Sequence, residues 1–296
     1  MSAPVRTRPA LDPAAVDAVV AAAEKKAAER GGRVVIAVVD RGGSLLSLRR
    51  TEGAQVASSR VAVYKARTAA IFVRPSRVLE EQVSSGRLGA LALSGAAALT
   101  GGIPLEVGGE VVGAIGTSGE TPDEDEAVSL AGAAVELPVV TESALTAAGA
   151  RAAATTAGDE SDRRGVAPVV AVVDDGGELV YLHRPDAAQV ASVRVATDKA
   201  RTAAMFRRPS KDFEDQASGG RPSALHLAGA VPLQGGLPLV SGGRVVGAVG
   251  VSGARSAEED SELAALAVAA FDQAVAAGSA GAGPAGAGAG VRRGSR

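Results

Sequence analysis

The sequence predicts an α+β fold, a sandwich of helices on a mainly antiparallel sheet, present twice in tandem. The first supporting observation is an internal repeat. Shifted by about 134 residues, the chain aligns with itself without a gap from Arg33 to Gly119, and roughly 52 of 87 positions are identical. The second is that apolar runs come in pairs joined by Gly-rich turns, which indicates hairpins rather than crossovers. The third is that long helical patterns precede, separate and follow these hairpins.

The repeat divides the 296 residues into two domains and a tail. We expect the first domain at residues 10–137 and the second at residues 140–278. Residues 279–296 are rich in Gly, Ala and Ser and are expected to form a disordered tail. Two homologous domains in one chain resemble a homodimer fused into one polypeptide. We therefore expect a pseudo-dimer whose copies pack against each other, with room for a further homo-oligomer.

Local signals place the elements of the first copy. Asp12 followed by Pro13 predicts a helix start, and that helix should reach about Arg30 and end at Gly31–Gly32. The elements expected after it are strands at 34–40 and 44–48, helices at 55–72 and 76–85, strands at 103–107 and 111–116, and a closing helix at 121–137.

The second copy should repeat this order. Its first helix is expected near Thr141–Ala157. The following segment, "GDESDRRG", is polar throughout and is expected to be a linker.

Composition and charge exclude several classes of function. The net charge of −2, with no basic block or interleaved aromatics, argues against a nucleic-acid partner. The absence of cysteine excludes disulfides, thiolate metal sites and a cysteine nucleophile. The N-terminus has no apolar signal-peptide core, and Gly and Pro interrupt the longest uncharged run, Leu88–Leu105. We therefore expect a cytoplasmic protein with no membrane partner.

A lysine stands in the middle of an alanine-rich helix in both copies, in "VYKARTAA" and "TDKARTAA". At helical spacing Lys65 shares a stripe with Val61, Ala69 and Phe72, and Lys199 has the same place in the second copy. The ammonium of such a lysine either snorkels to water or is held near an anion in a pocket. In the second case Lys65 and Lys199 are candidate catalytic residues, as a cation or a base.

Glycine-rich turns follow the second hairpin of each copy, at Gly113–Gly119 and Gly247–Gly253. Such turns can present N–H groups to an anion, but they lack the Gly-Lys-Ser/Thr of nucleotide loops, and tight turns explain them as well. The loops "GGIP" and "GGLP" share this ambiguity. Ser118 lies outside a Gly-x-Ser-x-Gly elbow, and the first copy has no histidine, so no Ser-His-Asp triad can form there.

The remaining polar clusters are acidic runs and two histidines. The runs "TPDEDE" and "SAEED" are expected to be solvated helix starts. His183 and His226 both lie in the second copy, at the positions of Arg49 and Ala92 in the first. An imidazole at the end of a strand, as expected for His183, can ligate a metal or a haem iron, or can be an ordinary exposed or hydrogen-bonded side chain.

Several motifs, in order and in both copies, resemble the GlcG/HbpS-like haem-binding family, which includes the C-terminal domain of PduO-type proteins. The family pattern is a "VVD-x-x-G" strand end, an "R-x-D-G-A" turn, a "KA-x-TA" helix, a "GG-x-P" loop and a Gly-rich hairpin before an acidic helix start. Here these motifs are Val38–Asp40 with Gly43, Arg50 with Glu52–Ala54, Lys65 to Ala69, Gly101–Pro104 and Gly113–Gly119, with their counterparts in the second copy. Glu52 replaces the usual Asp, and Ala187 replaces the usual Gly.

The resemblance implies an α-β-α sandwich around an antiparallel sheet of about five strands, and in some members haem binding for haem sensing, storage or breakdown. We accordingly expect haem as cofactor and a small molecule as partner. Propionates could pair with the cations of the motifs. His183 is the candidate iron ligand, and its lack of a counterpart predicts unequal copies. The expected binding residues are Arg50, Lys65, Thr68, Gly101, Gly102, Ser118, His183, Arg184, Lys199, Thr202, Gly235, Gly236 and Ser252.

Two other functions fit the same residues. One is an enzyme that acts on a small anionic metabolite, with Lys65 or Lys199 beside the glycine loops. The other is a structural or assembly module, in which the Gly and Lys positions serve packing alone.

Overall fold

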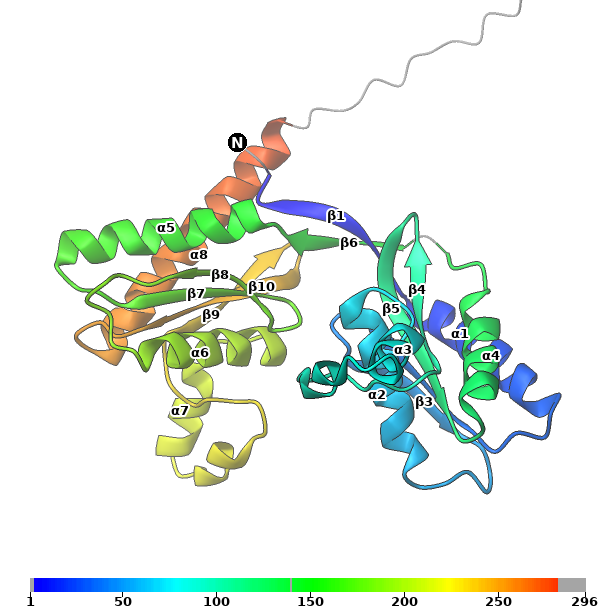
Figure 1. Cartoon of the computed structure of the whole chain (residues 1–296). Helices are drawn as coiled ribbons and strands as arrows, with labels where there is room; N and C mark the ends of the chain where they lie inside the picture. The colour runs from blue at the N-terminus through cyan, green and yellow to red at the C-terminus, as the bar shows by residue number, and fades with distance from the viewer. Residues whose placement is uncertain (1–2, 139, 282–296) are drawn as a thin grey trace, which may run out of the picture. The chain divides into compact units, whose positions relative to one another are not determined.

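A computed structural model of the chain describes residues 3–138 and 140–281. The described residues form two compact units. One consists of Thr7–Glu142, and the other begins at Ser143 and also includes the N-terminal residues up to Arg6 (Figure 1). Each unit contains one copy of the repeat.

The unit Thr7–Glu142 is built on a four-stranded sheet of order β3-β2-β5-β4, in which every neighbouring pair is antiparallel. The strands are β2 (Val35–Asp40), β3 (Leu45–Arg50), β4 (Gly102–Val107) and β5 (Glu110–Ser118). The helices are α1 (Pro13–Ala28), α2 (Ser58–Phe72), α3 (Arg77–Ser84), the 3₁₀ helix η1 (Leu88–Ala92) and α4 (Pro122–Ala133).

The second unit repeats this plan with the order β8-β7-β10-β9, again antiparallel throughout. Its strands are β7 (Val169–Asp174), β8 (Leu179–His183), β9 (Gly236–Ser241) and β10 (Arg244–Ser252). Its helices are α5 (Ala147–Arg164), α6 (Ser192–Phe206), α7 (Lys211–Ser218), the 3₁₀ helix η2 (Pro222–His226) and α8 (Ala257–Gly281).

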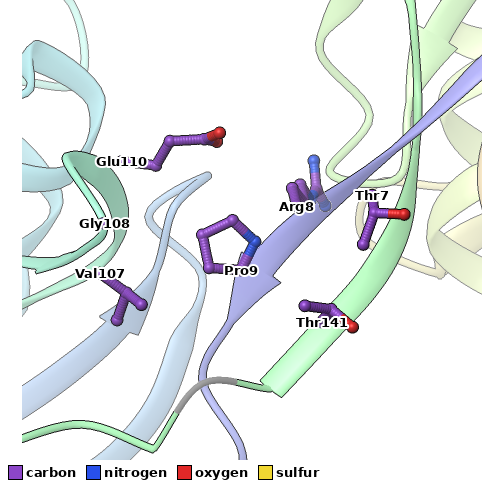
Figure 2. A pocket seen from close by; sticks show the side chains of 7 residues that line it. All are labelled: Thr7, Arg8, Pro9, Val107, Gly108, Glu110 and Thr141. Carbon is purple, nitrogen blue, oxygen red and sulfur yellow. The ribbon is translucent and has the colours of Figure 1, made fainter. Parts of the chain in front are cut away.

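Two further strands, β1 (Val5–Ala10) and β6 (Val140–Leu145), pair with each other in a separate two-stranded sheet. Figure 2 shows Thr7, Arg8 and Pro9 on β1 and Thr141 on β6. Neither strand was predicted, because both are short and mix polar with apolar residues. The five strands implied by the family resemblance are thus four in the sheet of each unit and one in this ribbon.

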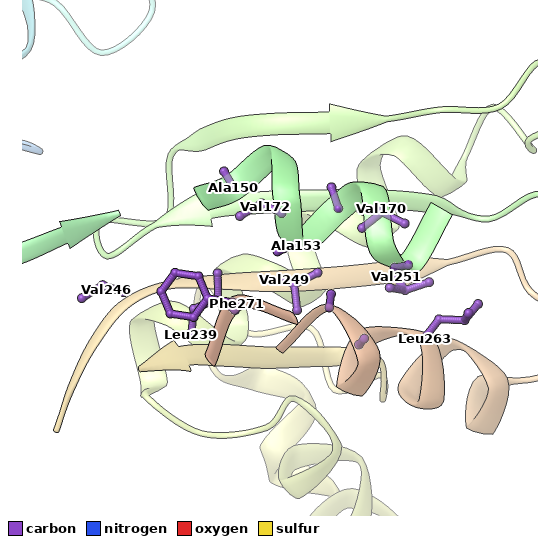
Figure 3. Packing of buried hydrophobic residues seen from close by; sticks show 14 residues of the cluster. Ala150, Ala153, Val170, Val172, Leu239, Val246, Val249, Val251, Leu263 and Phe271 are labelled. Atoms are coloured by element: carbon purple, nitrogen blue, oxygen red, sulfur yellow. The ribbon is translucent and has the colours of Figure 1, made fainter. Parts of the chain in front are cut away.

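Helices cover both faces of each sheet, which confirms the predicted α+β sandwich. In β2, Ile36 and Val38 pack with Val19 of α1 and Val128 of α4 on one face. On the other face Val35 packs with Ala62 of α2. The second unit follows the same scheme, and Figure 3 shows its larger cluster, between β7, β10, α5 and α8. Because the chain has few aromatics, these cores consist mainly of Val, Ala and Leu.

The alanine-rich helix α2 packs directly on β5. A Cβ atom on Gly116 would lie 2.3 Å from the carbonyl oxygen of Ala62 and 2.5 Å from the backbone nitrogen of Ala66, which leaves no room for a side chain. Gly250 meets Ala196 of α6 in the same way, at 2.0 Å. Small residues on α2 and on β5 therefore allow the helix to pack close to the sheet. The long side chain of Lys65, on this helix, is buried inside the domain.

The start of the second copy differs from the prediction. Residues 141–145, expected to begin a helix, lie in β6, and α5 begins only at Ala147. Thr146 is the N-cap, and its hydroxyl accepts a hydrogen bond from the Gly149 N–H at 3.0 Å. The segment predicted as a linker forms the last turns of α5, which ends at the left-handed Gly165. Its polar residues lie on the solvent side, while Gly158 and Ser161 face the core.

The C-terminal end also differs in part. Helix α8 extends to Gly281, so residues 279–281, expected in the disordered tail, are helical. Residues 282–296, the rest of that expected tail, lie outside the described residues. Among the described helices, none is long and apolar enough to cross a membrane.

Gly116→Ala is expected to lower the free energy of unfolding of its unit by about 1–3 kcal/mol, because the new methyl group forces α2 away from β5. Hydrogen exchange of residues 58–72, read by mass spectrometry, measures this locally. Gly89→Ala is the matched control, because a Cβ atom there meets nothing within 4 Å. Equal protection of α2 in the two variants would contradict the close packing.

Candidate functional site

Lys65 lies inside its unit, with only 5 % of its surface exposed. Its Nζ is 2.7 Å from Oδ2 of Asp125 in the first turn of α4, and it donates to the carbonyl oxygen of Thr117 at 3.0 Å. Lys199 is 3 % exposed and forms the same pair with Asp260 at 2.8 Å. The snorkelling alternative is therefore wrong for both lysines, and each ammonium has its anion within the domain.

Asp125 connects three parts of the unit. Its Oδ2 accepts from Lys65 on α2, and its Oδ1 accepts from the N–H of Glu120 in the turn after β5, at 3.1 Å. Asp260 does the same with the N–H of Ala254 at 3.0 Å. The acidic runs were expected to be solvated, which is wrong for these two residues, because Asp125 and Asp260 are buried. Burial raises the pKa of Asp125, and its bond to Lys65 opposes that shift.

The Gly-Gly-x-Pro loop packs on the turn of α2 that carries Lys65. A Cβ atom on Gly102 would lie 2.1 Å from the carbonyl oxygen of Lys65, and one on Gly101 would lie 3.1 Å from its Nζ. Ser129 of α4 donates to the carbonyl oxygen of Gly101 at 2.7 Å. Gly235 and Gly236 approach Lys199 equally closely, at 3.0 and 2.2 Å. These glycines are therefore required by packing around the ion pair.

Thr68 and Thr202, expected to bind a ligand, instead form hydrogen bonds to the loop that follows the 3₁₀ helix of each unit. Thr68 Oγ1 donates to the carbonyl oxygen of Tyr64 at 2.7 Å and accepts from the N–H of Ala97 at 2.8 Å. Thr202 makes the equivalent bonds to Asp198 and Val231, both at 2.8 Å. Each threonine thus fastens the loop that follows the 3₁₀ helix to α2 or α6.

The remaining expected residues are spread over each unit. Ser118 and Ser252 are buried at the ends of β5 and β10. Arg50, at the end of β3, is exposed and donates to the carbonyl oxygen of Ala54 at 2.9 Å. Arg184 follows β8 and is also exposed. The structure therefore brings Lys65 together with Gly101 and Gly102, and their counterparts likewise. Arg50 and Arg184 lie elsewhere, on the surface of their units.

His183 lies on the opposite face of its sheet from Lys199. It pairs with Val170, a residue of the core under α5 and α8, and a Cβ atom on Gly158 of α5 would lie 3.1 Å from its Nε2. Lys199 instead lies on α6, which covers the other face. His183 and Lys199 therefore do not form one site. His226 is exposed on η2.

A surface hollow of about 270 Å³ lies beside β1 and the β4–β5 turn of the unit Thr7–Glu142 (Figure 2). None of the residues expected from the sequence to bind a ligand lines it. Its lining residues are Thr7, Arg8, Pro9, Val107, Gly108, Glu110 and Thr141.

A second surface feature is an exposed apolar area on η1 and the loop after it, which we term the leucine surface. Gly95 in this loop faces α2, where a Cβ atom would lie 3.6 Å from Nε of Arg67 and 3.9 Å from Cδ1 of Ile71. The loop is fixed to α2 by the Thr68 bond described above. The leucine surface consists of Leu88, Leu91, Leu93 and Leu99, all at least 40 % exposed.

Arg67, on α2 beside this surface, differs from its counterpart Arg201. The Nε of Arg67 is buried and has no hydrogen-bond partner among the described residues. Arg201 donates from Nε to the carbonyl oxygen of Gly177 at 2.8 Å and reaches Glu178 at 3.5 Å. In the first copy Ser44 occupies the position of Glu178, so no carboxylate stands there.

A family model described as "Haem degrading protein HbpS-like" matches residues 11–134 and 145–269, one match for each copy of the repeat. The chain belongs to the HbpS-like family. This confirms the resemblance and the tandem duplication.

Three known proteins are each similar to a part of this chain. Protein GlcG of Escherichia coli (strain K12) is 37 % identical over 94 residues, which are 32 % of this chain and 70 % of GlcG. A double mutant of Streptomyces reticuli HbpS is 29 % identical, with 46 % of this chain and 97 % of that chain covered and a TM-score of 0.42. A PduOC:heme complex is 26 % identical, with 44 % and 98 % covered and a TM-score of 0.40.

Lys65→Met is expected to cost about 3–5 kcal/mol of unfolding free energy, because it leaves the Asp125 carboxylate buried without its cation. The double variant Lys65→Met with Asp125→Leu removes both charges and should recover much of this loss. Hydrogen exchange of residues 58–72 measures the effect in this unit. Lys25→Met, at an exposed lysine, is the control and should change stability by no more than about 0.5 kcal/mol. A single variant as stable as the control would contradict a structural role for the pair.

Proposed function

We propose that the protein binds haem or a related tetrapyrrole, for haem sensing, storage or breakdown. The observation that carries this proposal is the match of both copies to a family described as haem degrading. Haem supplies an iron that takes a further ligand and exchanges electrons. Its flat faces are apolar and its propionates are anionic, so a binding surface needs apolar side chains, a cation and a donor for the iron.

The outer face of α2 and the leucine surface meet the first two needs. Tyr64, Arg67 and Ile71 recur at helical spacing on α2, and Tyr64 is 52 % exposed. The leucine surface adds apolar area beside them. Arg67 supplies a cation that no carboxylate among the described residues neutralises. An amphiphilic dicarboxylate matches this combination of apolar area and unpaired charge.

Each unit offers a candidate iron donor. Tyrosine and histidine both serve as haem ligands in proteins. In the first copy, which has no histidine, Tyr64 stands three residues before Arg67 on the same face of α2. In the second copy Asp198 replaces Tyr64 and is within 3.6 Å of Arg194, so His183 is the donor to consider there. The proposal keeps His183 as a candidate ligand and keeps Arg50 and Arg184 as exposed cations for propionates.

Lys65 and Lys199 are less suited than the exposed arginines to bind a propionate. Lys65 and Lys199 are each bonded to a carboxylate and a backbone carbonyl inside the domain, so a propionate would have to displace a buried aspartate. The same bonds argue against Lys65 or Lys199 as the base of an enzyme, because such a base must reach the substrate.

Haemin added to the purified protein is expected to produce a Soret band that saturates at micromolar haemin. Tyr64→Phe removes the donor of the first unit and His183→Ala that of the second, so each should change the spectrum or the number of haemins bound per chain. His226→Ala is the matched control, because it removes an exposed histidine that is not proposed as an iron ligand. No saturable band in the wild-type chain would overturn the proposal.

Arg67→Gln is expected to weaken haemin binding by roughly tenfold, because the propionate loses a charge-assisted hydrogen bond. Arg60→Gln, at an exposed arginine near the start of α2, is the control. Titrations at low and high salt measure the difference. Equal affinity for the two variants would contradict the placement of the ligand beside Arg67.

A further inference from the structure

Strands β1 and β6 are the same segment of the two repeats, and they pair with each other. Each precedes the first helix of its copy. Asp12 caps α1 through the N–H of Ala15 at 2.7 Å, and Thr146 caps α5 through the N–H of Gly149 at 3.0 Å. These two caps are 134 residues apart, the offset of the repeat. The ribbon is therefore a strand paired with its own duplicate.

The register of the ribbon makes it symmetric. Thr146 N–H donates to the carbonyl oxygen of Pro4 at 3.0 Å, and Arg8 lies opposite Glu142. The two strands are therefore antiparallel, because the earlier residue on β1 faces the later residue on β6. Arg8 and Glu142 are themselves 134 residues apart, so this position faces its own duplicate. It is the centre of a local twofold symmetry of the ribbon.

The contact at this centre is a buried ion pair. Arg8 Nε donates to Oε1 of Glu142 at 2.8 Å, and Nη2 lies 2.8 Å from the same oxygen. The side chains are only 6 % and 13 % exposed. Both residues belong to the compact unit Thr7–Glu142. A buried guanidinium and carboxylate stabilise each other only when both are present.

Symmetry makes this pair selective. If β1 paired with β1 of a second chain in the same register, Arg8 would face Arg8, and two β6 strands would place Glu142 against Glu142. Like charges directly opposite each other in a ribbon are destabilising, and more so when buried. In a dimer of single-copy chains both strands would carry the same residue at the centre, so a pair of opposite charges could not form there. Duplication allowed the two positions to diverge into opposite charges.

We propose that the charges at positions 8 and 142 decide which strand pairs in the ribbon, so that β1 accepts β6 and rejects the β1 segment of another copy of this chain. In the wild-type chain they select β1 with β6 and reject like strands. The proposal does not rest on haem binding. Because the ribbon is symmetric, the two charges should be exchangeable, which is not expected of an ion pair in an asymmetric site.

The first experiment exchanges the charges in the full chain. Arg8→Glu and Glu142→Arg, each alone, should reduce hydrogen-exchange protection of residues 5–10 by at least roughly tenfold, because like charges then meet in the ribbon. The double variant Arg8→Glu with Glu142→Arg again places opposite charges at the centre and should recover protection well above that of either single variant. A double variant as unprotected as the single variants would overturn the proposal.

The second experiment tests partner choice. Chains with Arg8→Glu and chains with Glu142→Arg are refolded together and examined by native mass spectrometry, with one chain isotopically labelled. The opposite charge for the centre of each ribbon strand now lies on the other chain, so mixed dimers should form that are absent from either variant alone. The charge-exchanged double variant refolded with wild-type chain is the control and should give no excess of mixed dimers. Mixed single variants that yield no mixed dimers would overturn the proposal.

Discussion

The buried pair of Lys65 with Asp125, repeated as Lys199 with Asp260, is the interaction on which each unit depends. In the first unit it joins α2, the end of β5 and the first turn of α4. Glycines at the helix–sheet contact and in the Gly-Gly-x-Pro loop bring the backbone close enough to enclose it. The lysine and glycine motifs therefore have a structural role. The long cationic side chain of Lys65 is enclosed by the carboxylate of Asp125 and by glycines of the Gly-Gly-x-Pro loop.

Most of the fold followed from local patterns, and the site followed from them only in part. Hairpins, caps and alternation placed the sheet and most helices, because these depend on neighbours in the chain. Asp125 was missed as the partner of Lys65 because an acidic residue in a first helical turn has an ordinary solvated explanation, and their contact spans 60 residues. The strand β6 was missed because its pairing partner, β1, precedes the first helix of the other copy, 134 residues earlier in the chain.

The two copies of the repeat share their buried contacts but differ in their exposed residues. The ion pair, the glycine contacts and the threonine bonds recur with nearly the same distances. The surfaces have diverged: Tyr64 became Asp198, Arg67 lacks the carboxylate that Arg201 has, and only the second copy has histidines. At the ribbon, Arg8 and Glu142 diverged into opposite charges. The core therefore preserves the fold, while the diverged surfaces are where the two copies can acquire different functions.

We propose that the lysine–aspartate pairs are structural and that a ligand binds on the diverged surfaces. Crystals of the full chain grown with haemin test this most directly, because anomalous scattering locates each iron without assumption. We expect iron beside Tyr64 on the outer face of α2, beside His183, or at both, with the lysine–aspartate pairs intact. Iron or a propionate in contact with Lys65 or Lys199, with its aspartate displaced, would contradict it.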